Sequence, residues 1–272
     1  MRLVKSLIIV ALLSAFLNVR GQSNDALLKR IDFNDTTLID SDLLRLTLAE
    51  YITSAQDPNL SAKNQVYNVI LAADNVMGRC VSSYPMYKFV YQYLIYGFSE
   101  LGMNPAVDYM VHLPYFENLD ADATQRDELM AIAESYVRVK IGSKAPDIQA
   151  VTIKNTDFHL YEVNADYTII LFWSYSCPHC RELIDDLSKL FGKDDSFAVV
   201  TVNVAGDLKA VKRLLKKKHL EKYAICDGKG WDSPIVDAYA VDMTPSMLLL
   251  DKDKNIIAKP FDIEELIKEI ER

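Results

Sequence analysis

Two cysteines separated by two residues are the part of this sequence best suited to chemistry. Cys177 and Cys180 enclose Pro178 and His179 in a CPHC motif, which follows an apolar segment and opens a charged, helical one. A thiol at the N-terminus of a helix meets unpaired backbone amides and the positive end of the helix dipole, and both favour the thiolate. Because only the thiolate attacks a disulfide, Cys177 is predicted to be the nucleophile. Cys180, one helical turn later, is predicted to resolve the mixed disulfide.

The two residues inside the motif fit this use. Pro178 suits the first helical turn, where its missing N–H is not needed. His179 would add a cation or an N–H donor near the thiolate, and stabilising the reduced form makes a disulfide couple more oxidising. The only redox group that this chemistry requires is the disulfide between Cys177 and Cys180, so the sequence predicts no separate cofactor.

A CxxC motif has two other interpretations, half of a zinc site and an inert disulfide. Structural zinc is normally held by four ligands. No second CxxC and no paired histidines follow the motif. The sequence therefore predicts no metal site, and the inert disulfide is the remaining alternative to a redox pair.

Two segments carry a resemblance to a known family. The stretch FWSYSCPHC resembles the strand, loop and helix of the thioredoxin superfamily active site, and Thr244-Pro245 before SMLLLD resembles its cis-proline loop. The resemblance implies that Pro245 has a cis peptide bond and lies against both cysteines, and that the backbone at Thr244 pairs with a substrate chain. Trp173 is interpreted either as core beneath the active-site loop or as part of the substrate-binding surface with Thr244 and Pro245.

Spacing favours one branch of that superfamily. Cys177 and Pro245 are 68 positions apart, more than in a minimal thioredoxin and far fewer than in DsbA. This spacing and the segment GSKAPDIQAVTIKNTDFHLYEV are similar to the TlpA/ResA-like proteins, over residues 142–270. The resemblance implies a thiol-disulfide oxidoreductase that acts on thiols or disulfides of exported proteins or peptides and is recharged by a redox partner, which could be a membrane protein. CPHC is the dipeptide pattern of DsbA rather than of thioredoxins, and the direction of electron flow stays open.

Two positions depart from the family pattern. Leu171 stands where thioredoxin has a buried acidic residue, and Leu183 stands where many ResA-like proteins have a glutamate. Glu182 is one position short of the latter, and about 100° per residue turns it toward another helix face. We expect Glu182 to be a solvated acid, and the sequence predicts no general base.

The pattern of the chain changes near residue 142. Residues 22–141 show helix starts and stops throughout, whereas residues 142–272 alternate short β-branched runs with charged helical ones. The predicted fold class is α/β, a C-terminal thioredoxin-like fold with a central mixed sheet flanked by helices, preceded by an all-α domain. A hairpin is expected at 151–153 and 159–163, before a buried strand at 168–173.

Residues 1–21 are typical of a secretory signal peptide. Basic residues at 2 and 5 precede an apolar run at 7–17, and Val19 and Gly21 supply small residues for cleavage. The run is shorter than the roughly 20 residues of a membrane-spanning helix. We therefore expect an exported protein, periplasmic or in the cell envelope and soluble after cleavage; a permanent anchor is the alternative.

Charge excludes one class of partner. The chain has 30 Lys and Arg against 38 Asp and Glu, and removing residues 1–21 leaves 27 against 38. Nucleic acid binding needs a basic face that neutralises phosphates, so no nucleic acid partner is expected. The rival function is a partner- or peptide-binding module in which the thioredoxin-like half is only a scaffold.

Further residues have more than one interpretation. Cys80 and Cys226 are each a buried small hydrophobe, or they pair with each other across the domains, or they relay electrons to the CPHC pair. Tyr84, Tyr87 and Tyr91 share one face of a predicted helix. That stripe is interpreted as core or domain interface, with a groove for a peptide substrate as the alternative.

Overall fold

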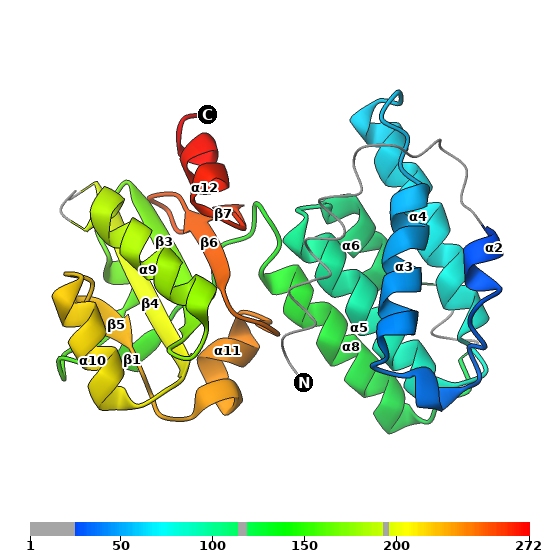
Figure 1. Ribbon diagram of the computed structural model, residues 1–272, viewed down its shortest axis with the longest axis horizontal. Coiled ribbons are helices and arrows are strands. Elements are labelled where there is room, and N and C mark those ends of the chain that lie inside the picture. Colours follow the sequence, from blue (N-terminus) through cyan, green and yellow to red (C-terminus); the bar gives the residue numbers. More distant parts are fainter. Residues whose placement is uncertain (1–24, 114–118, 193–195) are drawn as a thin grey trace. The chain divides into compact units, whose positions relative to one another are not determined.

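The computed structural model describes residues 25–113, 119–192 and 196–272 (Figure 1). The chain forms two compact units, Met1–Tyr136 and Val137–Arg272. The division lies in the last turn of a helix, a little before the position at which the sequence pattern changes. The expected signal peptide at 1–21 lies outside the described residues.

The described part of the first unit is helical, which confirms the predicted all-α region before the sheet. Polar caps and prolines start its helices: Ser41 and Ser61 accept backbone hydrogen bonds from the first turns of their helices, and two others have a proline in the first turn. The elements are α2 (Asp25–Leu28), η2 (Thr36–Leu38), α3 (Asp42–Ser54), α4 (Ala62–Arg79), α5 (Tyr84–Glu100), α6 (Asn104–Val111) and α8 (Ala123–Arg138).

The tyrosine stripe of α5 belongs to the core of this unit. Tyr87 and Tyr91 are fully buried, and their rings stack with centroids 6.3 Å apart. Tyr84 is partly buried and its hydroxyl donates to the carboxylate of Glu128 in α8. The core interpretation is confirmed for Tyr87 and Tyr91. A peptide groove lined by these two rings is excluded, because neither reaches the surface.

A five-stranded mixed sheet organises the second unit. Its strand order is β5-β4-β3-β6-β7, in which β3 is parallel to β4, β4 is parallel to β5, and β6 is antiparallel to both β3 and β7. The predicted fold class is confirmed. The strands are β3 (Tyr167–Ser174), β4 (Phe197–Ala205), β5 (Tyr223–Ile225), β6 (Ser246–Leu250) and β7 (Ile256–Ala258).

Two crossovers place helices on one face of this sheet. The connection from β3 to β4 contains α9 (Pro178–Phe191), and the connection from β4 to β5 contains α10 (Leu208–Lys217). Successive right-handed crossovers in one direction cover the same face. The buried cluster on that face joins Leu171 and Trp173 of β3 to apolar residues of α9, α10 and the terminal helix α12 (Ile263–Ile270).

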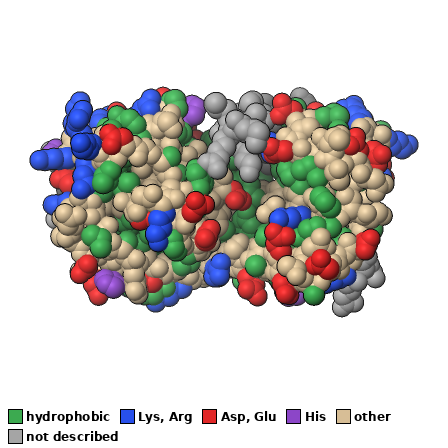
Figure 2. Space-filling view, turned by 90° about the horizontal axis from the view of Figure 1, so that it is seen from below, with side chains coloured by type: hydrophobic (Ala, Val, Ile, Leu, Met, Phe, Trp, Pro, Cys, Tyr) green, Lys and Arg blue, Asp and Glu red, His purple; other side chains and the backbone are tan. Residues whose placement is uncertain are grey.

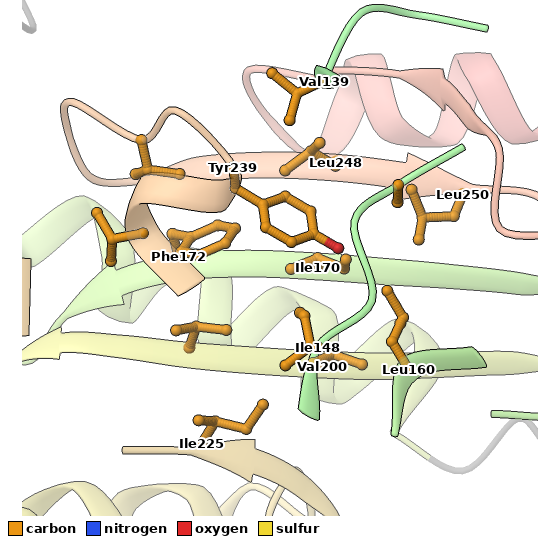
Figure 3. Close-up of a cluster of buried hydrophobic side chains, with 14 of the residues drawn as sticks. Val139, Ile148, Leu160, Ile170, Phe172, Val200, Ile225, Tyr239, Leu248 and Leu250 are labelled. Atoms are coloured by element: carbon orange, nitrogen blue, oxygen red, sulfur yellow. The ribbon is translucent and has the colours of Figure 1, made fainter. Parts of the chain in front are cut away.

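The opposite face is covered by α11 (Pro234–Ala238) and by the segment that precedes β3. Figure 3 shows Tyr239 lying over Ile170 and Phe172 of β3, with Ile148 and Leu160 in the same cluster. The Tyr239 hydroxyl donates to the carbonyl of Pro146 at 2.6 Å. A short η4 (Gly230–Asp232) leads into α11.

The predicted hairpin exists, but its position is different. The paired strands are β1 (Gln149–Val151) and β2 (Asp157–His159), and 160–162 form a 3-10 turn, η3 (Leu160–Glu162). The prediction was wrong about 152–153, because this segment leaves the hairpin and pairs with the outer edge of β5. Thr152 bridges Ile225, and the Ile153 N–H donates to the carbonyl of Ala224 at 2.8 Å.

The other edge of the sheet, at β7, is also paired with a neighbouring segment of the chain. The N–H of Ile256 in β7 donates to the carbonyl of Ser143 at 2.8 Å, and Ala145 donates to the carbonyl of Lys254 at 2.8 Å. The segment that enters the second unit therefore runs along β7 before it reaches the hairpin.

Acidic and basic side chains are mixed over the face that Figure 2 shows, in keeping with a chain rich in both. None of the helices in the described ranges has the length and the apolar character that crossing a bilayer requires.

Candidate active site

Cys177 lies at the junction of β3 and α9, as the motif predicts. It is the N-cap of α9, with Pro178 in the first helical position. Its Sγ accepts a hydrogen bond from the backbone N–H of Cys180 at 3.3 Å. The sulfur thus takes the place of an N-cap oxygen, where unpaired helix amides and the helix dipole favour a negative charge.

The loop before β6 comes to the same sulfur. The Thr244-Pro245 peptide bond is cis, which confirms the expectation from the family resemblance. Cys177 Sγ lies 3.9 Å from the carbonyl oxygen of Thr244, and both Thr244 and Pro245 are partly exposed. The structure therefore brings the Thr244-Pro245 loop to Cys177, although 67 positions separate Thr244 from Cys177 along the chain.

Cys180 has very different surroundings from Cys177. Its side chain is fully buried, whereas Cys177 is partly exposed, and both are free thiols. Burial, and after it the hydrogen bond to Cys177, raise the pKa of the Cys180 thiol to about 12. Desolvation disfavours the charged form of a buried thiol. Cys177 is therefore the accessible sulfur of the pair and Cys180 the protected one.

His179 faces the solvent. Its Nδ1 lies 3.3 Å from the Glu182 carboxylate, and the two side chains are 78% and 72% exposed. Among the described residues, the hydrogen-bond partners of Cys177 Sγ are backbone groups of Cys180 and Thr244 and the Cys180 thiol rather than the imidazole. Glu182 is an exposed acid, as expected.

Trp173 does not form part of an exposed binding surface. Its side chain is 0% exposed and packs in the cluster beneath α9, with its ring 6.5 Å from that of Tyr175. The assignment of Trp173 to substrate binding is therefore wrong for this conformation, and the core interpretation holds. The alternation of β3 explains the result, since Trp173 shares its inward face with Leu171.

The position below the cysteines is apolar. Leu171 pairs in register with Thr201 of β4 and Met247 of β6, and all three are buried. The Thr201 hydroxyl has no hydrogen-bond partner in the described part of the chain. The structure thus places no carboxylate where thioredoxin has one, and no general base is assigned.

Three residues that the sequence analysis did not single out contact the strand and loop before Cys177. Arg181 donates from Nη1 to the carbonyl of Tyr175 at 2.8 Å, and Asn203 donates from Nδ2 to the carbonyl of Trp173 at 3.3 Å. Gly206 has a φ of +141°, and a Cβ there would lie 2.6 Å from Tyr175 Cβ. In the sequence, the Gly-Asp pair that starts at Gly206 and the arginine that follows Cys180 were the features that could have indicated these contacts.

The other two cysteines are also free. Cys80 is fully buried among the helices of its unit, and burial raises the pKa of its thiol to about 12. Cys226 is partly buried and donates to the Asn203 side-chain oxygen at 3.7 Å. It lines a cavity of about 430 Å³ with Lys212 and Lys229, and burial raises its pKa. Burial supports the small-hydrophobe interpretation for Cys80.

The described residues contain no group of histidine, cysteine, aspartate and glutamate side chains arranged to hold a metal ion. The CPHC site contains two free thiols, those of Cys177 and Cys180.

The fold agrees with a comparison to known families. Residues 141–259 match the model of the AhpC/TSA family. The C-terminal domain is thioredoxin-like. The match covers less than half of the chain, so the family assignment applies to this domain, and the helical unit lies outside it.

Curated relatives of the thioredoxin-like domain are redox proteins by name. Two proteins called "Thiol-disulfide oxidoreductase ResA" match it. One, from Bacillus cereus, is 24% identical over 45% of this chain and 70% of its own length. The other, from Halalkalibacterium halodurans, is 22% identical over 43% of this chain and 66% of its own length. The chain thus spans about two thirds of each relative, and the resemblance to the TlpA/ResA-like branch is supported.

A solved structure resembles both units. A thioredoxin-like protein from Bacteroides caccae aligns with a TM-score of 0.55 at 17% identity, over 89% of this chain and 88% of its own. At that identity the likeness shows the fold alone. A helical unit followed by a thioredoxin-like domain is therefore an arrangement that another protein shares.

Proposed function

We propose that this chain is a thiol-disulfide oxidoreductase in which Cys177 is the attacking sulfur and Cys180 the resolving one. One observation carries the proposal: the partly exposed Cys177 Sγ sits at the N-terminus of α9, 3.3 Å from the Cys180 N–H, and faces the Thr244 carbonyl before a cis proline. An accessible thiol, amides that favour its thiolate and a buried second thiol are the parts that disulfide exchange needs.

The reaction proceeds in two exchanges. The Cys177 thiolate attacks one sulfur of a substrate disulfide, the substrate S–S bond breaks, and one substrate thiolate leaves. The Cys180 thiolate then attacks Cys177 Sγ, releases the second substrate thiolate and closes the Cys177–Cys180 disulfide. Two electrons have passed to the substrate, and the proton of each attacking thiol goes to solvent. The reverse sequence oxidises a substrate dithiol, and the potential of the recharging partner sets the net direction.

The backbone at Thr244 is proposed to hold the substrate chain. Its carbonyl is partly exposed and adjacent to the attacking sulfur, so an extended peptide that pairs with it would bring its own sulfur to Cys177. Thr244 and Pro245 are the proposed substrate-binding residues.

The test is to follow the two sulfurs separately. We expect Cys177 to be alkylated first, because Cys180 is fully buried. Cys180→Ser should accumulate mixed disulfides with a disulfide-containing protein such as insulin, and Cys177→Ser should accumulate none. Faster alkylation of Cys180, or mixed disulfides in Cys177→Ser, would overturn the assignment.

The rival proposal is a peptide-binding module without redox turnover. It predicts that peptide affinity is the same in wild type and in Cys177→Ser, and that insulin is not reduced in the presence of dithiothreitol above the uncatalysed rate. The free and unequally exposed thiols favour the oxidoreductase.

Export is part of the proposal. The exported substrates and the cell-envelope location rest on the signal-like residues 1–21. An intact mass that begins near Gln22, with the protein recovered outside the cytoplasm, is the expected result. A mature protein that retains Met1 would contradict it.

A further inference from the structure

The first turn of α9 carries a charge of the unfavourable sign. Arg181 is the fourth residue of the helix, and this turn contains no acidic residue. Of the other described helices, α3 and α12 begin with acidic residues in their first turns, whereas α4 and α10 carry Lys63 and Lys209 there. A cation near the positive end of a helix dipole is destabilising unless something compensates it.

Arg181 contacts the residue two positions before the attacking cysteine through its side chain, and the cysteine itself through the ordinary backbone bond of the helix. Its Nη1 donates to the carbonyl of Tyr175 at 2.8 Å, two residues before Cys177, and its backbone N–H donates to the carbonyl of Cys177 at 3.3 Å. Tyr175 is tied in turn to β4, because its N–H donates to the carbonyl of Ala205 at 2.9 Å. The loop that presents Cys177 is therefore fixed to the sheet at one side and to α9 at the other.

The charge of Arg181 is not neutralised by a neighbour. His179 in the same turn lies beside Glu182, and Lys189 in the last turn of α9 pairs with Asp186 at 2.9 Å. Among the described residues, no carboxylate lies within ion-pair distance of Arg181, in contrast to these two side chains. A thiolate at Cys177 would be an anion close to the loop that the guanidinium holds.

We propose that Arg181, rather than His179, is the side chain that positions the Cys177 loop and stabilises its thiolate. The inference rests on the proposed redox function. It assigns Arg181 as a positioning residue, which acts through the Tyr175 carbonyl and through its charge. Loss of the cation would disfavour the thiolate, and with it the reduced state, so the CPHC pair would become a weaker oxidant.

Three variants separate the contributions. Arg181→Met removes both charge and donor, Arg181→Gln keeps a donor, and Arg181→Lys keeps the charge. The matched control is Lys189→Met, which removes a cation from the last turn of the same helix. Each protein is equilibrated with reduced and oxidised glutathione, and the ultraviolet absorbance of the thiolate is titrated against pH.

We expect Arg181→Met and Arg181→Gln to shift the glutathione equilibrium about threefold toward the Cys177–Cys180 disulfide, with Arg181→Lys close to wild type. The thiolate should form at a pH about half a unit higher in the first two variants. Lys189→Met should change neither the glutathione equilibrium nor the pH at which the thiolate forms. A structural role alone would lower the urea midpoint and leave both measurements unchanged, and that result would overturn the inference.

Failure of this inference differs from failure of the proposed function. If wild type equilibrates with glutathione and Arg181→Met gives the same constant, only the role of Arg181 is rejected. If wild type does not exchange with glutathione at all, the redox function is rejected. The thiolate titration needs no turnover, and it still shows whether Arg181 stabilises the anion.

Discussion

Side chains around Cys177 divide into those that hold its loop and those that face the solvent. The sulfur contacts backbone groups of Cys180 and Thr244, while His179 turns toward Glu182. Stabilisation of a thiolate at Cys177 is therefore expected first from backbone amides at the helix start, which are fixed by the fold. His179 and Arg181 are both exposed, but the Arg181 guanidinium is held at the Tyr175 carbonyl, whereas His179 lies beside Glu182.

We predict a small effect at His179 and an opposite one at Glu182. His179→Gln should change the glutathione equilibrium by less than about twofold, because an exposed pair in water contributes little. Glu182→Gln should favour the thiolate and make the pair a stronger oxidant, since it removes a negative charge from the start of α9. Equilibration of each variant against glutathione measures both. A larger loss of oxidising power in His179→Gln than in Arg181→Met would contradict the expectation that Arg181 has the larger effect.

Cys80 provides a prediction on stability. Its pKa is about 12 in the folded chain, against about 8.5 for an unfolded cysteine. The raised pKa means that the folded state keeps the Cys80 proton to a higher pH than the unfolded state does. The contribution of Cys80 to the free energy of unfolding is therefore complete below about pH 8.5 and is lost as the pH rises toward 12. The expected loss is up to about 1.4 kcal/mol per pH unit in that window.

The measurement compares wild type with Cys80→Ala by urea unfolding at a series of pH values. Both proteins share every other titrating group, so the difference in the free energy of unfolding isolates Cys80. Cys80→Ala should be the less stable protein at neutral pH, by about 1 to 2 kcal/mol. That gap should narrow above about pH 9. A gap that stays constant would mean that the thiol ionises without unfolding.

At the scale of elements, the β3–α9 junction is shaped by the turn after the neighbouring strand. Gly206 follows β4 with a φ of +141°, and the position of its missing Cβ lies 2.6 Å from Tyr175 Cβ. Tyr175 begins the loop that presents Cys177. A side chain at position 206 would push against that loop, so glycine is required here for two independent reasons.

Gly206→Ala is predicted to destabilise the C-terminal domain by about 2 to 4 kcal/mol, from backbone strain and from the clash together. The matched control is Gly228→Ala, which has a φ of +77° but no atom within 4 Å of the added Cβ. It should cost about 1 kcal/mol from strain alone. Urea unfolding of both variants gives the comparison, and equal losses would show that Tyr175 can move aside.

The order of elements could be predicted from sequence where the pattern is long and regular. The buried strand expected at 168–173 is β3 (Tyr167–Ser174), within one residue at each end. The hairpin was displaced because 152–153 pair with β5, a contact between residues about seventy positions apart that local pattern does not contain.

Directions of side chains were harder to predict than positions of elements. The family resemblance placed Pro245 beside Cys177 and Cys180, because a strand, a helix start and a cis-proline loop are fixed by the fold. The direction in which the side chains of His179 and Arg181 point could not be predicted. Both are long or polar side chains on an exposed turn, where a choice among rotamers costs little and depends on neighbours such as Glu182 and the Tyr175 carbonyl.

At the scale of the whole molecule, each unit has a core of its own. The buried side chains of the sheet are supplied by residues from Val139 onward, and the aromatic core of α5 lies within the helical unit. The redox geometry described above uses residues 173–245 alone. The helical unit is therefore not needed to build the CPHC site, and a role in choosing substrates is open to it.

We predict that the isolated Val137–Arg272 unit folds and has the same glutathione equilibrium as the full chain, within about twofold. Its rate with a large protein disulfide should be lower than that of the full chain if the helical unit recognises substrates. Equilibration and turnover measured on both proteins separate the two roles. A changed equilibrium constant would show that the helical unit acts on the cysteines themselves.

The borders of the five-stranded sheet have a consequence for aggregation. Thr152 and Ile153 line β5, and Ser143 and Ala145 line the β7 side, so that the described sheet offers no unpaired strand edge at either border over these contacts. Open edges recruit strands from other chains and seed aggregates. Under the function proposed above, a substrate chain would pair at Thr244 instead, where the carbonyl oxygen lies 3.9 Å from Cys177 Sγ.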